Sequence, residues 1–404
     1  MDIVVVGASV AGMSAVEAVR STGFEGRITV VGAEDELPYD KPPLSKEFLA
    51  GDVTEADIAL CTRSQLDSFD VELMLGAAVT HVDAEQRLLE LSTGVLLPYD
   101  GVLLATGMAP RRLNCAGADL AGIHYLRTLD DARRLQADMA AGGEMVVIGT
   151  GFIGGEVASS GRRRGLDVTM VELAPAAFSG SVEPLVAEAL TAAHIAEGVR
   201  ILCGRSVVRF DGGDRVRSVV LSDGTVIAAD IVVVGIGAAP QDGYLERSTL
   251  ARADGVLCDR YCRTNTPAIY AAGDVCRWYN PRYERHGRVE HWTNAVEQGA
   301  QAARNLVLEL SGSDDERVAY SPVPYFWSRQ CERMFQYAGV RHESASLSLE
   351  GDVEGPRWAV TAHVGDTITS AFTANWPGRA VKYRRLLNES HAHEMAMSLD
   401  HQVR

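Results

Sequence analysis

The 404-residue chain contains no long apolar run and has a deficit of positive charge. No stretch reaches the 18 or so consecutive apolar residues expected of a membrane-spanning helix. Lysine and arginine number 38 against 54 aspartates and glutamates, giving a formal net charge of −16. Such an acidic chain is unsuited to nucleic acid or anionic membrane, except through a local basic patch. The apolar run Ile3–Val6 follows Asp2 without a basic stretch, so we expect no secretory signal and a cytoplasmic protein.

Cysteine is also scarce and irregularly placed. The chain has 7 cysteines, an odd number, and they are scattered along its length. The one close pair, Cys258 and Cys262, is neither a C-x-x-C redox motif nor half of a zinc site with a second pair. The cysteine spacing of a plant-type iron–sulfur cluster is absent as well. We therefore expect free thiols in a reducing compartment and no metal site.

Glycine, by contrast, is abundant, with 39 residues, and one pattern places several of them. The β-branched run Ile3–Val6 predicts a strand buried on both faces. The turn Gly7-Ala8-Ser9-Val10-Ala11-Gly12 follows, then a helix-favouring segment and a second strand, Arg27–Val31, that leads to Glu34. This pattern is typical of a dinucleotide-binding βαβ unit, in which the diphosphate lies at the helix N-terminus and the acid binds ribose hydroxyls. Ser9 replaces the middle glycine.

The same pattern recurs later in the chain. Met145–Ile148 predicts a strand, and Gly149-Thr150-Gly151-Phe152-Ile153-Gly154 has all three glycines of the turn. A further strand, Asp167–Val171, ends at Glu172. A single glycine-rich turn occurs in many α/β folds, but two complete units argue for two nucleotide sites.

Three other predicted strands end in glycine turns. Tyr99–Leu104 precedes Ala105-Thr106-Gly107, and Asp230–Val234 precedes Gly235-Ile236-Gly237. We expect both to belong to the first site, because they bracket the second unit as if it were an inserted domain. The third strand ends at Ala271-Ala272-Gly273-Asp274. Its aspartate either caps the following helix or accepts hydrogen bonds from a cofactor.

Together these motifs resemble the flavoprotein reductases that have two dinucleotide-binding domains. Leu37–Lys46, which includes Pro42-Pro43-Leu44-Ser45-Lys46, resembles a segment of the oxygenase-coupled ferredoxin reductases. Glu290-His291-Trp292 and Val323–Ser328 extend the resemblance, which covers the chain to about Gly339. Disulfide reductases of this superfamily have a cysteine pair beside the flavin, and neither of the two corresponding segments contains cysteine here.

The resemblance implies FAD bound by the first unit and NADH bound by the second. Trp327 is alternatively a core aromatic. By resemblance, the cofactor-binding residues are Gly7, Ser9, Ala11, Gly12, Glu34, Lys41, Lys46, Val79, Ala105, Thr106, Gly107, Arg127, Gly149, Gly151, Ile153, Gly154, Glu156, Glu172, Gly237, Gly273, Asp274, Glu290, His291, Trp292 and Trp327.

Two of these residues are implied to be catalytic. Lys46 is expected beside the flavin, paired with Glu156, so that the lysine stabilises negative charge on reduced flavin and the glutamate offsets its desolvation. Alternatively, Glu156 is an ordinary acid at a helix start. Glu172 is followed by no arginine that would accept a 2′-phosphate, which favours NADH over NADPH.

The implied reaction is hydride transfer from NADH to FAD N5, followed by single-electron transfer to a 2Fe–2S ferredoxin that serves a haem monooxygenase or a ring-hydroxylating oxygenase. A rubredoxin reductase-like enzyme and a redox signalling flavoprotein of the apoptosis-inducing-factor kind are the alternatives. Ferredoxins are usually acidic, so docking on this acidic chain needs a local basic face. The candidate residues are Arg329, Arg333, Arg379, Lys382, Arg384 and Arg385. A solvated helix face is the other interpretation of this cluster.

The predicted fold class is α/β, with two Rossmann-like dinucleotide-binding domains and a C-terminal α/β domain. We expect an FAD domain at 1–111 and 236–317, with an NADH domain inserted at 112–235. The region 318–404 alternates strand-like runs with turns, which predicts a sheet followed by a terminal helix.

Overall fold

A computed structural model describes the backbone of residues 1–402 and the side chains of residues 1–389. The chain divides into two compact units. Unit 1 comprises Met1–Asp40, Ala56–Ala109 and Ala239–Pro324, and unit 2 comprises Lys41–Glu55, Pro110–Ala238 and the chain from Tyr325 onward. The chain passes from unit 1 into unit 2 within the short strand β8 (Met108–Pro110), and it returns to unit 1 within the short strand β17 (Ala238–Pro240).

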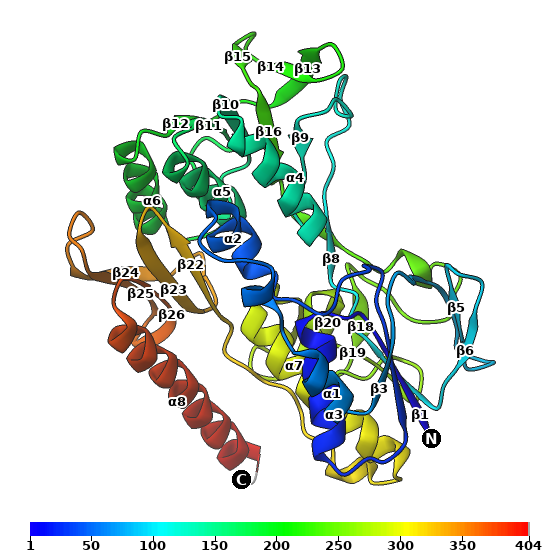
Figure 1. The fold of residues 1–404 in the computed structure, drawn as a ribbon. Helices are drawn as coiled ribbons and strands as arrows, with labels where there is room; N and C mark the ends of the chain where they lie inside the picture. The colour runs from blue at the N-terminus through cyan, green and yellow to red at the C-terminus, as the bar shows by residue number, and fades with distance from the viewer. Residues whose placement is uncertain (403–404) are drawn as a thin grey trace. The chain divides into compact units, whose positions relative to one another are not determined.

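Unit 1 is built on a parallel sheet with the order β19-β7-β1-β2-β3 (Figure 1). The central strands are almost completely buried because both faces of the sheet are covered, which explains their continuous β-branched sequences. Helices α1 (Val10–Ser21) and α7 (Trp292–Leu310) pack so closely that a Cβ on Gly299 would lie 2.3 Å from the Ala11 carbonyl oxygen. The strands of this sheet are β1 (Asp2–Val6), β2 (Arg27–Val31), β3 (Val71–Met74), β7 (Gly101–Leu104) and β19 (Ile269–Ala271).

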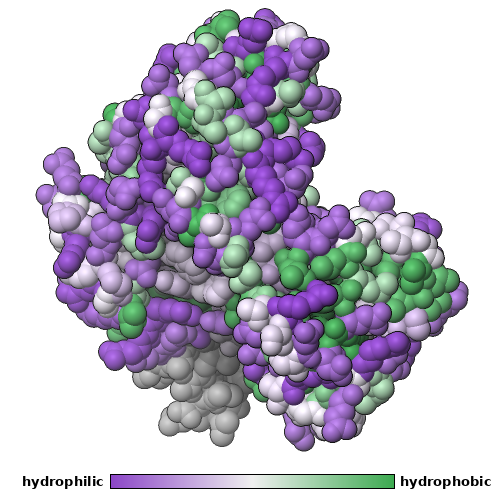
Figure 2. Space-filling view, viewed as in Figure 1, coloured by the Kyte–Doolittle hydropathy of each residue, from purple (hydrophilic) through white to green (hydrophobic). Residues whose placement is uncertain are grey.

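Two small sheets complete unit 1. One has the order β4-β5-β6, and at its edge Val95 and Leu96 are exposed, where Figure 2 shows hydrophobic surface. The other has the order β18-β20-β21. Their strands are β4 (Val79–Asp83), β5 (Leu88–Leu91), β6 (Leu96–Pro98), β18 (Val256–Cys258), β20 (Cys276–Asn280) and β21 (Arg285–Gly287). The short helices are α3 (Arg63–Ser68), η2 (Ala56–Ile58), η3 (Gly243–Leu245), η4 (Gly273–Val275) and η5 (Asp314–Glu316).

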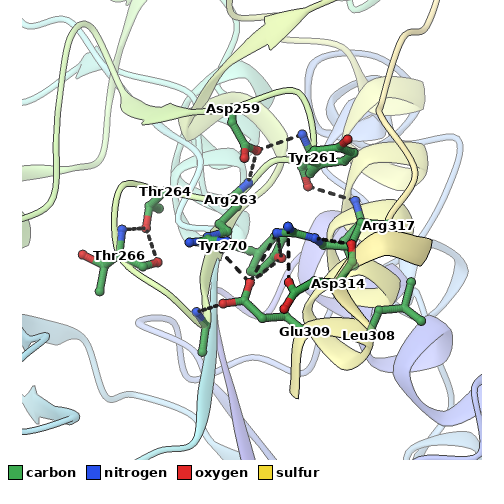
Figure 3. Close-up of polar contacts among 12 residues, drawn as sticks. Asp259, Tyr261, Arg263, Thr264, Thr266, Tyr270, Leu308, Glu309, Asp314 and Arg317 are labelled. Carbon is green, nitrogen blue, oxygen red and sulfur yellow. Dashed lines mark hydrogen bonds and ion pairs between the residues drawn. The ribbon is translucent and has the colours of Figure 1, made fainter. Parts of the chain in front are cut away.

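A polar cluster joins the end of α7 to β19 (Figure 3). Glu309 accepts hydrogen bonds from the backbone N–H of Ala268 at 2.8 Å and from the hydroxyl of Tyr270 at 2.7 Å. Arg317 lies 3.6 Å from the same carboxylate and 5.0 Å from the ring centre of Tyr261. Burial raises the pKa of Tyr270, so its hydroxyl stays protonated and donates. This cluster fixes α7 against the sheet.

Unit 2 contains a second parallel sheet, with the order β12-β11-β10-β16-β9. A three-stranded antiparallel sheet, β13-β14-β15, is separate from it. The strands are β9 (Ile123–His124), β10 (Glu144–Ile148), β11 (Asp167–Val171), β12 (Arg200–Leu202), β13 (Val207–Gly212), β14 (Val216–Leu221), β15 (Val226–Ala228) and β16 (Ile231–Val234). The helices are η1 (Pro42–Ser45), α2 (Glu47–Ala50), α4 (Leu129–Ala140), α5 (Phe152–Arg163) and α6 (Pro184–Ala196).

The C-terminal part of unit 2 is an antiparallel sheet with the order β22-β23-β26-β25-β24, followed by the long helix α8 (Pro377–Gln402). Aromatic rings fill its core, with Phe335, Trp358 and Phe372 fully buried. The strands are β22 (Tyr325–Gln330), β23 (Arg333–Gly339), β24 (Ser346–Gly351), β25 (Trp358–Val364) and β26 (Thr367–Ala374). A sheet with a terminal helix is what the sequence predicts here.

The α/β fold class and both βαβ units are confirmed, and one strand assignment is wrong. The segment predicted as Asp230–Val234 forms β16, which pairs with β10 in unit 2 instead of belonging to the first site. Its register places Val234 beside Ile148, so it is the unit 2 counterpart of β7. The predicted strand at Tyr99–Leu104 begins at Gly101 and does join the first sheet.

Candidate functional site

In unit 1, the first glycine turn joins the end of β1 to the start of α1. Gly7 has a φ of +122°, and a Cβ there would lie 2.2 Å from the Ala105 carbonyl oxygen. A Cβ on Gly12 would lie 1.9 Å from the Gly7 carbonyl oxygen. These two glycines are therefore required by the turn itself. Ser9 is the N-cap residue of α1 but makes no side-chain capping hydrogen bond, so the helix N-terminus is left for an anionic ligand.

The other glycine turns of unit 1 lie at the same edge of the sheet. Ala105 follows β7 and donates its N–H to the carbonyl oxygen of Val6 at 2.7 Å. Gly273, in η4 after β19, donates its N–H to Oε1 of Gln298 at 2.8 Å. A Cβ on Gly273 would lie 3.1 Å from that of Ala11. Because the carboxyl ends of parallel strands meet at one edge, the structure brings these turns together.

The remaining unit 1 residues of the predicted site occupy several elements. Glu34, after β2, accepts a hydrogen bond from the Tyr39 hydroxyl at 2.5 Å. Trp292 begins α7, and its Nε1 donates to Oδ1 of Asp40 at 2.6 Å. Burial lowers the pKa of His291 to about 4, so the imidazole is neutral. The other placements are Val79 buried in β4, Thr106 and Gly107 after β7, Asp274 half-buried in η4, and Glu290 exposed and paired with Arg288.

In unit 2, the second glycine turn repeats the geometry of the first. Gly149 has a φ of +98°, and a Cβ there would lie 2.2 Å from the Gly235 carbonyl oxygen. A Cβ on Gly154 would lie 2.2 Å from the Gly149 carbonyl oxygen. A Cβ on Gly151 would meet nothing within 4 Å. Ile153, at the start of α5, is 54% exposed, although an isoleucine of this helix would ordinarily be buried.

Glu172 is held at the second turn by hydrogen bonds. The backbone N–H and the hydroxyl of Thr150 donate to its Oε2 at 2.9 and 2.6 Å, and the N–H of Ala174 donates to its Oε1 at 2.9 Å. Burial opposes ionisation, but these donors prevail and lower the pKa of Glu172. The result is an ionised acceptor beside the turn, suited to ribose hydroxyls and repulsive to a 2′-phosphate.

Lys46 and Glu156 form a buried ion pair within unit 2. Lys46 Nζ lies 2.9 Å from Glu156 Oε2, and the two side chains are 9% and 6% exposed. Pro42 and Pro43 begin the short helix η1, which positions Lys46 at the junction with α2. Glu156 is in the first turns of α5, but it is buried and paired, unlike an ordinary solvated acid at a helix start.

The remaining residues of the predicted site in unit 2 lie in other elements. Lys41 Nζ donates to the carbonyl oxygen of Arg127 at 3.5 Å, just before the capping box of α4. Gly237 lies after β16. Trp327 is half-buried in β22 rather than part of the core, and it lines a groove together with Tyr325, Met334, Gln336, Asn375 and Pro377.

Three polar residues that the sequence did not indicate surround the ion pair. Ser45 donates to Glu156 Oε2 at 2.5 Å, and Ser328 donates to Glu156 Oε1 at 2.6 Å. Gln330 in turn donates to Ser328 at 2.9 Å. Ser45 and Ser328 belong to segments used for the family resemblance, but no local pattern indicates that they meet the same carboxylate.

All seven cysteines are free thiols. Burial raises the pKa of Cys331 to about 12, so this thiol stays protonated. Burial likewise raises the pKa values of Cys61 and Cys258. Among the residues whose side chains are described, no group of three or more His, Cys, Asp or Glu side chains is arranged to hold a metal ion. None of the helices in this part of the chain combines the length and hydropathy needed to cross a bilayer.

The two turns fit dinucleotide diphosphates. Each turn leads into a helix N-terminus, Ser9 makes no side-chain capping hydrogen bond, and a Cβ on Gly151 would meet nothing within 4 Å. FAD at the first turn and NAD(H) at the second therefore match the residues present.

Comparison with known proteins extends this result. Residues 1–299 match the family described as pyridine nucleotide-disulphide oxidoreductase, and residues 325–404 match the reductase C-terminal family. Rhodocoxin reductase of Rhodococcus erythropolis is 35% identical over 96% of this chain and 89% of its own length. The ferredoxin–NAD(+) reductase component of the p-cumate 2,3-dioxygenase system of Pseudomonas putida is 36% identical over 96% of this chain and 93% of its own.

Solved structures are also similar to this protein over nearly the whole chain. The covalent complex of putidaredoxin reductase with putidaredoxin superposes with a TM-score of 0.90 at 30% identity, covering 96% of this chain and 93% of that one. The ferredoxin reductase of the CYP199A2 system from Rhodopseudomonas palustris gives a TM-score of 0.88 at 31% identity, covering 93% and 91%. With both nucleotide turns and the C-terminal region matched, the chain belongs to the pyridine nucleotide-disulphide oxidoreductase family, among relatives that are ferredoxin reductases.

Proposed function

We propose that this protein is an FAD flavoprotein that oxidises NADH and reduces a ferredoxin serving an oxygenase. The observation that carries the proposal is similarity over nearly the whole chain to reductases of that kind, including the C-terminal region. FAD supplies the step between a two-electron donor and a one-electron acceptor. The protein supplies binding and electrostatics, with the first turn and Asp274 holding FAD, and the second turn and Glu172 holding NADH.

Lys46 and Glu156 are proposed to act on the flavin. An ammonium held in a buried site stabilises negative charge that develops on an adjacent group, because burial reduces dielectric screening. Glu156 supplies the counter-charge for that ammonium in its buried site, at an Nζ–Oε2 distance of 2.9 Å. Lys46→Ala should slow flavin reduction by NADH in stopped-flow mixing roughly tenfold. An unchanged rate would remove Lys46 from the mechanism.

The activity is tested by adding NADH and a panel of purified acceptors to the holoenzyme. A flavin spectrum with fast reduction of at least one 2Fe–2S ferredoxin supports the proposal. Preference for rubredoxin would favour the alternative acceptor, since a rubredoxin–NAD(+) reductase of Pseudomonas putida is also 32% identical over 94% of this chain. Slow NADH oxidation, a persistent charge-transfer band and no gain from any acceptor would contradict electron transfer and favour a signalling flavoprotein.

A docking surface is proposed on the C-terminal part of unit 2. Arg384 lies over the ring of Tyr325 at 4.8 Å, at the groove that Trp327 also lines. Lys382 and Arg385 are exposed on α8. Two of the cations are partly neutralised, because Arg379 pairs with Glu350, and Arg385 lies 3.4 Å from Glu389. Arg329 is exposed and Arg333 half-buried on the neighbouring strands.

Charge reversal at Arg384 and Arg385 tests this surface without breaking the Arg379–Glu350 pair. Arg384→Glu with Arg385→Glu should raise the ferredoxin KM about tenfold and weaken its salt dependence. Ferricyanide needs no docking, so the ratio of ferredoxin to ferricyanide turnover should fall. The control is Arg209→Glu in β13, an exposed arginine of the same unit. An equal effect of the control, or an equal loss with both acceptors, would rule out this patch.

A further inference from the structure

A buried chain of hydrogen bonds runs through unit 2 from Lys46 to His194. It continues from the ion pair through Ser328 and Gln330, and ends where His194 Nε2 lies 2.9 Å from Gln330 Oε1. All of its members are buried, and His194 is completely buried. The chain joins a short helix, α5, β22 and α6, so no single segment of the sequence contains it.

Two acceptors set the direction of the hydrogen bonds in this chain: the Glu156 carboxylate, and the backbone carbonyl oxygen of Phe152, to which the Gln330 NH₂ group donates at 3.5 Å. Glu156 is an acceptor only, so the single hydroxyl hydrogen of Ser328 points to its Oε1. The Ser328 oxygen must then accept, which places the NH₂ group of Gln330 toward it and the amide oxygen toward His194. That oxygen accepts only, so His194 carries its hydrogen on Nε2. The two acceptors thus select one tautomer of a histidine on α6.

The surroundings of His194 and Gln330 hold this arrangement. Burial lowers the pKa of His194, so the ring is neutral, and its Nδ1 has no hydrogen-bond partner, as expected for the unprotonated nitrogen. The ring stacks on Phe178 with 5.4 Å between centres. A Cβ on Gly155 would lie 2.2 Å from Gln330 Oε1, so a larger residue there would displace the amide.

The opposite direction would disconnect Glu156. If His194 carried its hydrogen on Nδ1, its Nε2 would accept from the Gln330 amide, and the amide oxygen would face Ser328. The serine hydroxyl would then donate to Gln330, leaving Glu156 Oε1 without that donor. Lys46 and Ser45 would still bind Oε2. The tautomer of His194 and the hydrogen bonding of Glu156 are therefore coupled through the side chains of Gln330 and Ser328.

We propose that Ser328, Gln330 and His194 are positioning residues that fix Glu156, and through it the charge that Lys46 presents to the flavin. Ser328 donates to Oε1 of Glu156, whereas Lys46 and Ser45 donate to Oε2. Without the Ser328 donor, less of the negative potential of the Glu156 carboxylate is offset by a hydrogen bond. The more negative potential disfavours negative charge on reduced flavin. The inference rests on the proposed position of Lys46 beside the flavin.

The midpoint potential of the bound flavin, measured by equilibration with redox dyes, tests the proposal. Ser328→Ala and Gln330→Leu should lower the potential, in the same direction as Lys46→Ala and opposite to Glu156→Gln. We expect a threefold to tenfold shift of the reduction equilibrium, about 15 to 30 mV for a two-electron couple. Ser328→Thr, which keeps the hydroxyl, should restore most of the potential.

Ser370→Ala is the matched control. Ser370 is also a buried serine of the C-terminal sheet that donates to a buried glutamate, Glu183, at 2.6 Å, but that carboxylate lies outside the chain to Lys46. The Ser370→Ala variant should leave the midpoint potential of the flavin unchanged. If Lys46→Ala shifts the potential and Ser328→Ala does not, the positioning role is overturned while the proposed role of Lys46 stands. If Lys46→Ala has no effect, both are overturned.

A second measurement does not depend on the flavin. Nitrogen NMR of the histidines should show a neutral His194 protonated on Nε2, assigned by the loss of its signals in His194→Gln. Gln330→Leu should move those signals, and Ser370→Ala should not. A His194 protonated on Nδ1 would overturn the direction of the chain and with it the proposal.

Discussion

The two glycine turns have the same backbone geometry and differ at their middle residue. In both, a first glycine with positive φ lies against the carbonyl oxygen that ends a neighbouring strand, Ala105 for Gly7 and Gly235 for Gly149. The middle residue differs, because Ser9 in unit 1 corresponds to Gly151 in unit 2. The outer glycines are thus required by the fold, whereas a Cβ at the middle position of the second turn meets nothing within 4 Å.

The acids that follow the turns differ as well. Glu172 is bound by Thr150 of its own turn, whereas Glu34 is bound by Tyr39, from the segment after it. The second acid is therefore oriented by the turn itself. The proposed role of Glu172 in selecting NADH would therefore rest on a carboxylate that the protein orients before the ligand binds.

The largest effect is expected from breaking the shared part of the turns. Gly149→Ala adds a Cβ 2.2 Å from a backbone oxygen at a φ of +98°, so it should destabilise the protein by roughly 3 kcal/mol or more. Gly165→Ala is the control, since its φ is +80° but nothing lies within 4 Å of the new Cβ. It should cost only about 1 kcal/mol. Equal shifts in thermal unfolding would show that backbone conformation alone, and not close approach, requires Gly149.

An intermediate effect is expected at the second acid. Glu172→Gln weakens the acceptor for the ribose hydroxyls and removes the charge that repels a 2′-phosphate. The kcat/KM for NADH should fall about tenfold, and the ratio of NADPH to NADH efficiency should rise. Glu188→Gln, an exposed position on α6 with the same change in charge, is the control. A wild-type enzyme that prefers NADPH, or an unchanged ratio in Glu172→Gln, would contradict the assignment.

The smallest effect is expected from making the two turns alike. Gly151→Ser places a side chain where a Cβ meets nothing within 4 Å, so thermal unfolding should stay within about 2 °C of wild type. The KM for NADH should rise severalfold, because the added atoms occupy ligand space, while FAD content stays the same. A loss of stability like that of Gly149→Ala would show that the middle glycine also serves the fold.

The sequence predicts local features well where a periodic pattern and a turn occur together. Arg27–Val31 and Asp167–Val171 are strands with the predicted limits. The misassigned strand, β16, has the same kind of sequence as β7, since both are buried strands before a glycine turn. Hydrophobic composition specifies a buried strand but not the sheet that receives it, because pairing partners are chosen by packing.

The candidate site divides in the same way. The turns, Glu172 and the Lys46 segment are visible in the sequence because each lies within one continuous motif. The donors to Glu156 Oε1 and Oε2 come from residues 328 and 45, and the glutamine that orients one of them is fixed by a histidine on α6.

By itself, the sequence determined the α/β class, the two glycine turns and the place of Glu172 after the second of them. Those features depend on interactions between residues close in the chain, such as the approach of Gly154 to Gly149. Only the tertiary structure decided which sheet holds β16 and which groups surround the Lys46–Glu156 pair. Buried hydrogen bonds between distant segments exist only after the backbone brings donors and acceptors within about 3 Å, and the order of residues does not encode that distance directly.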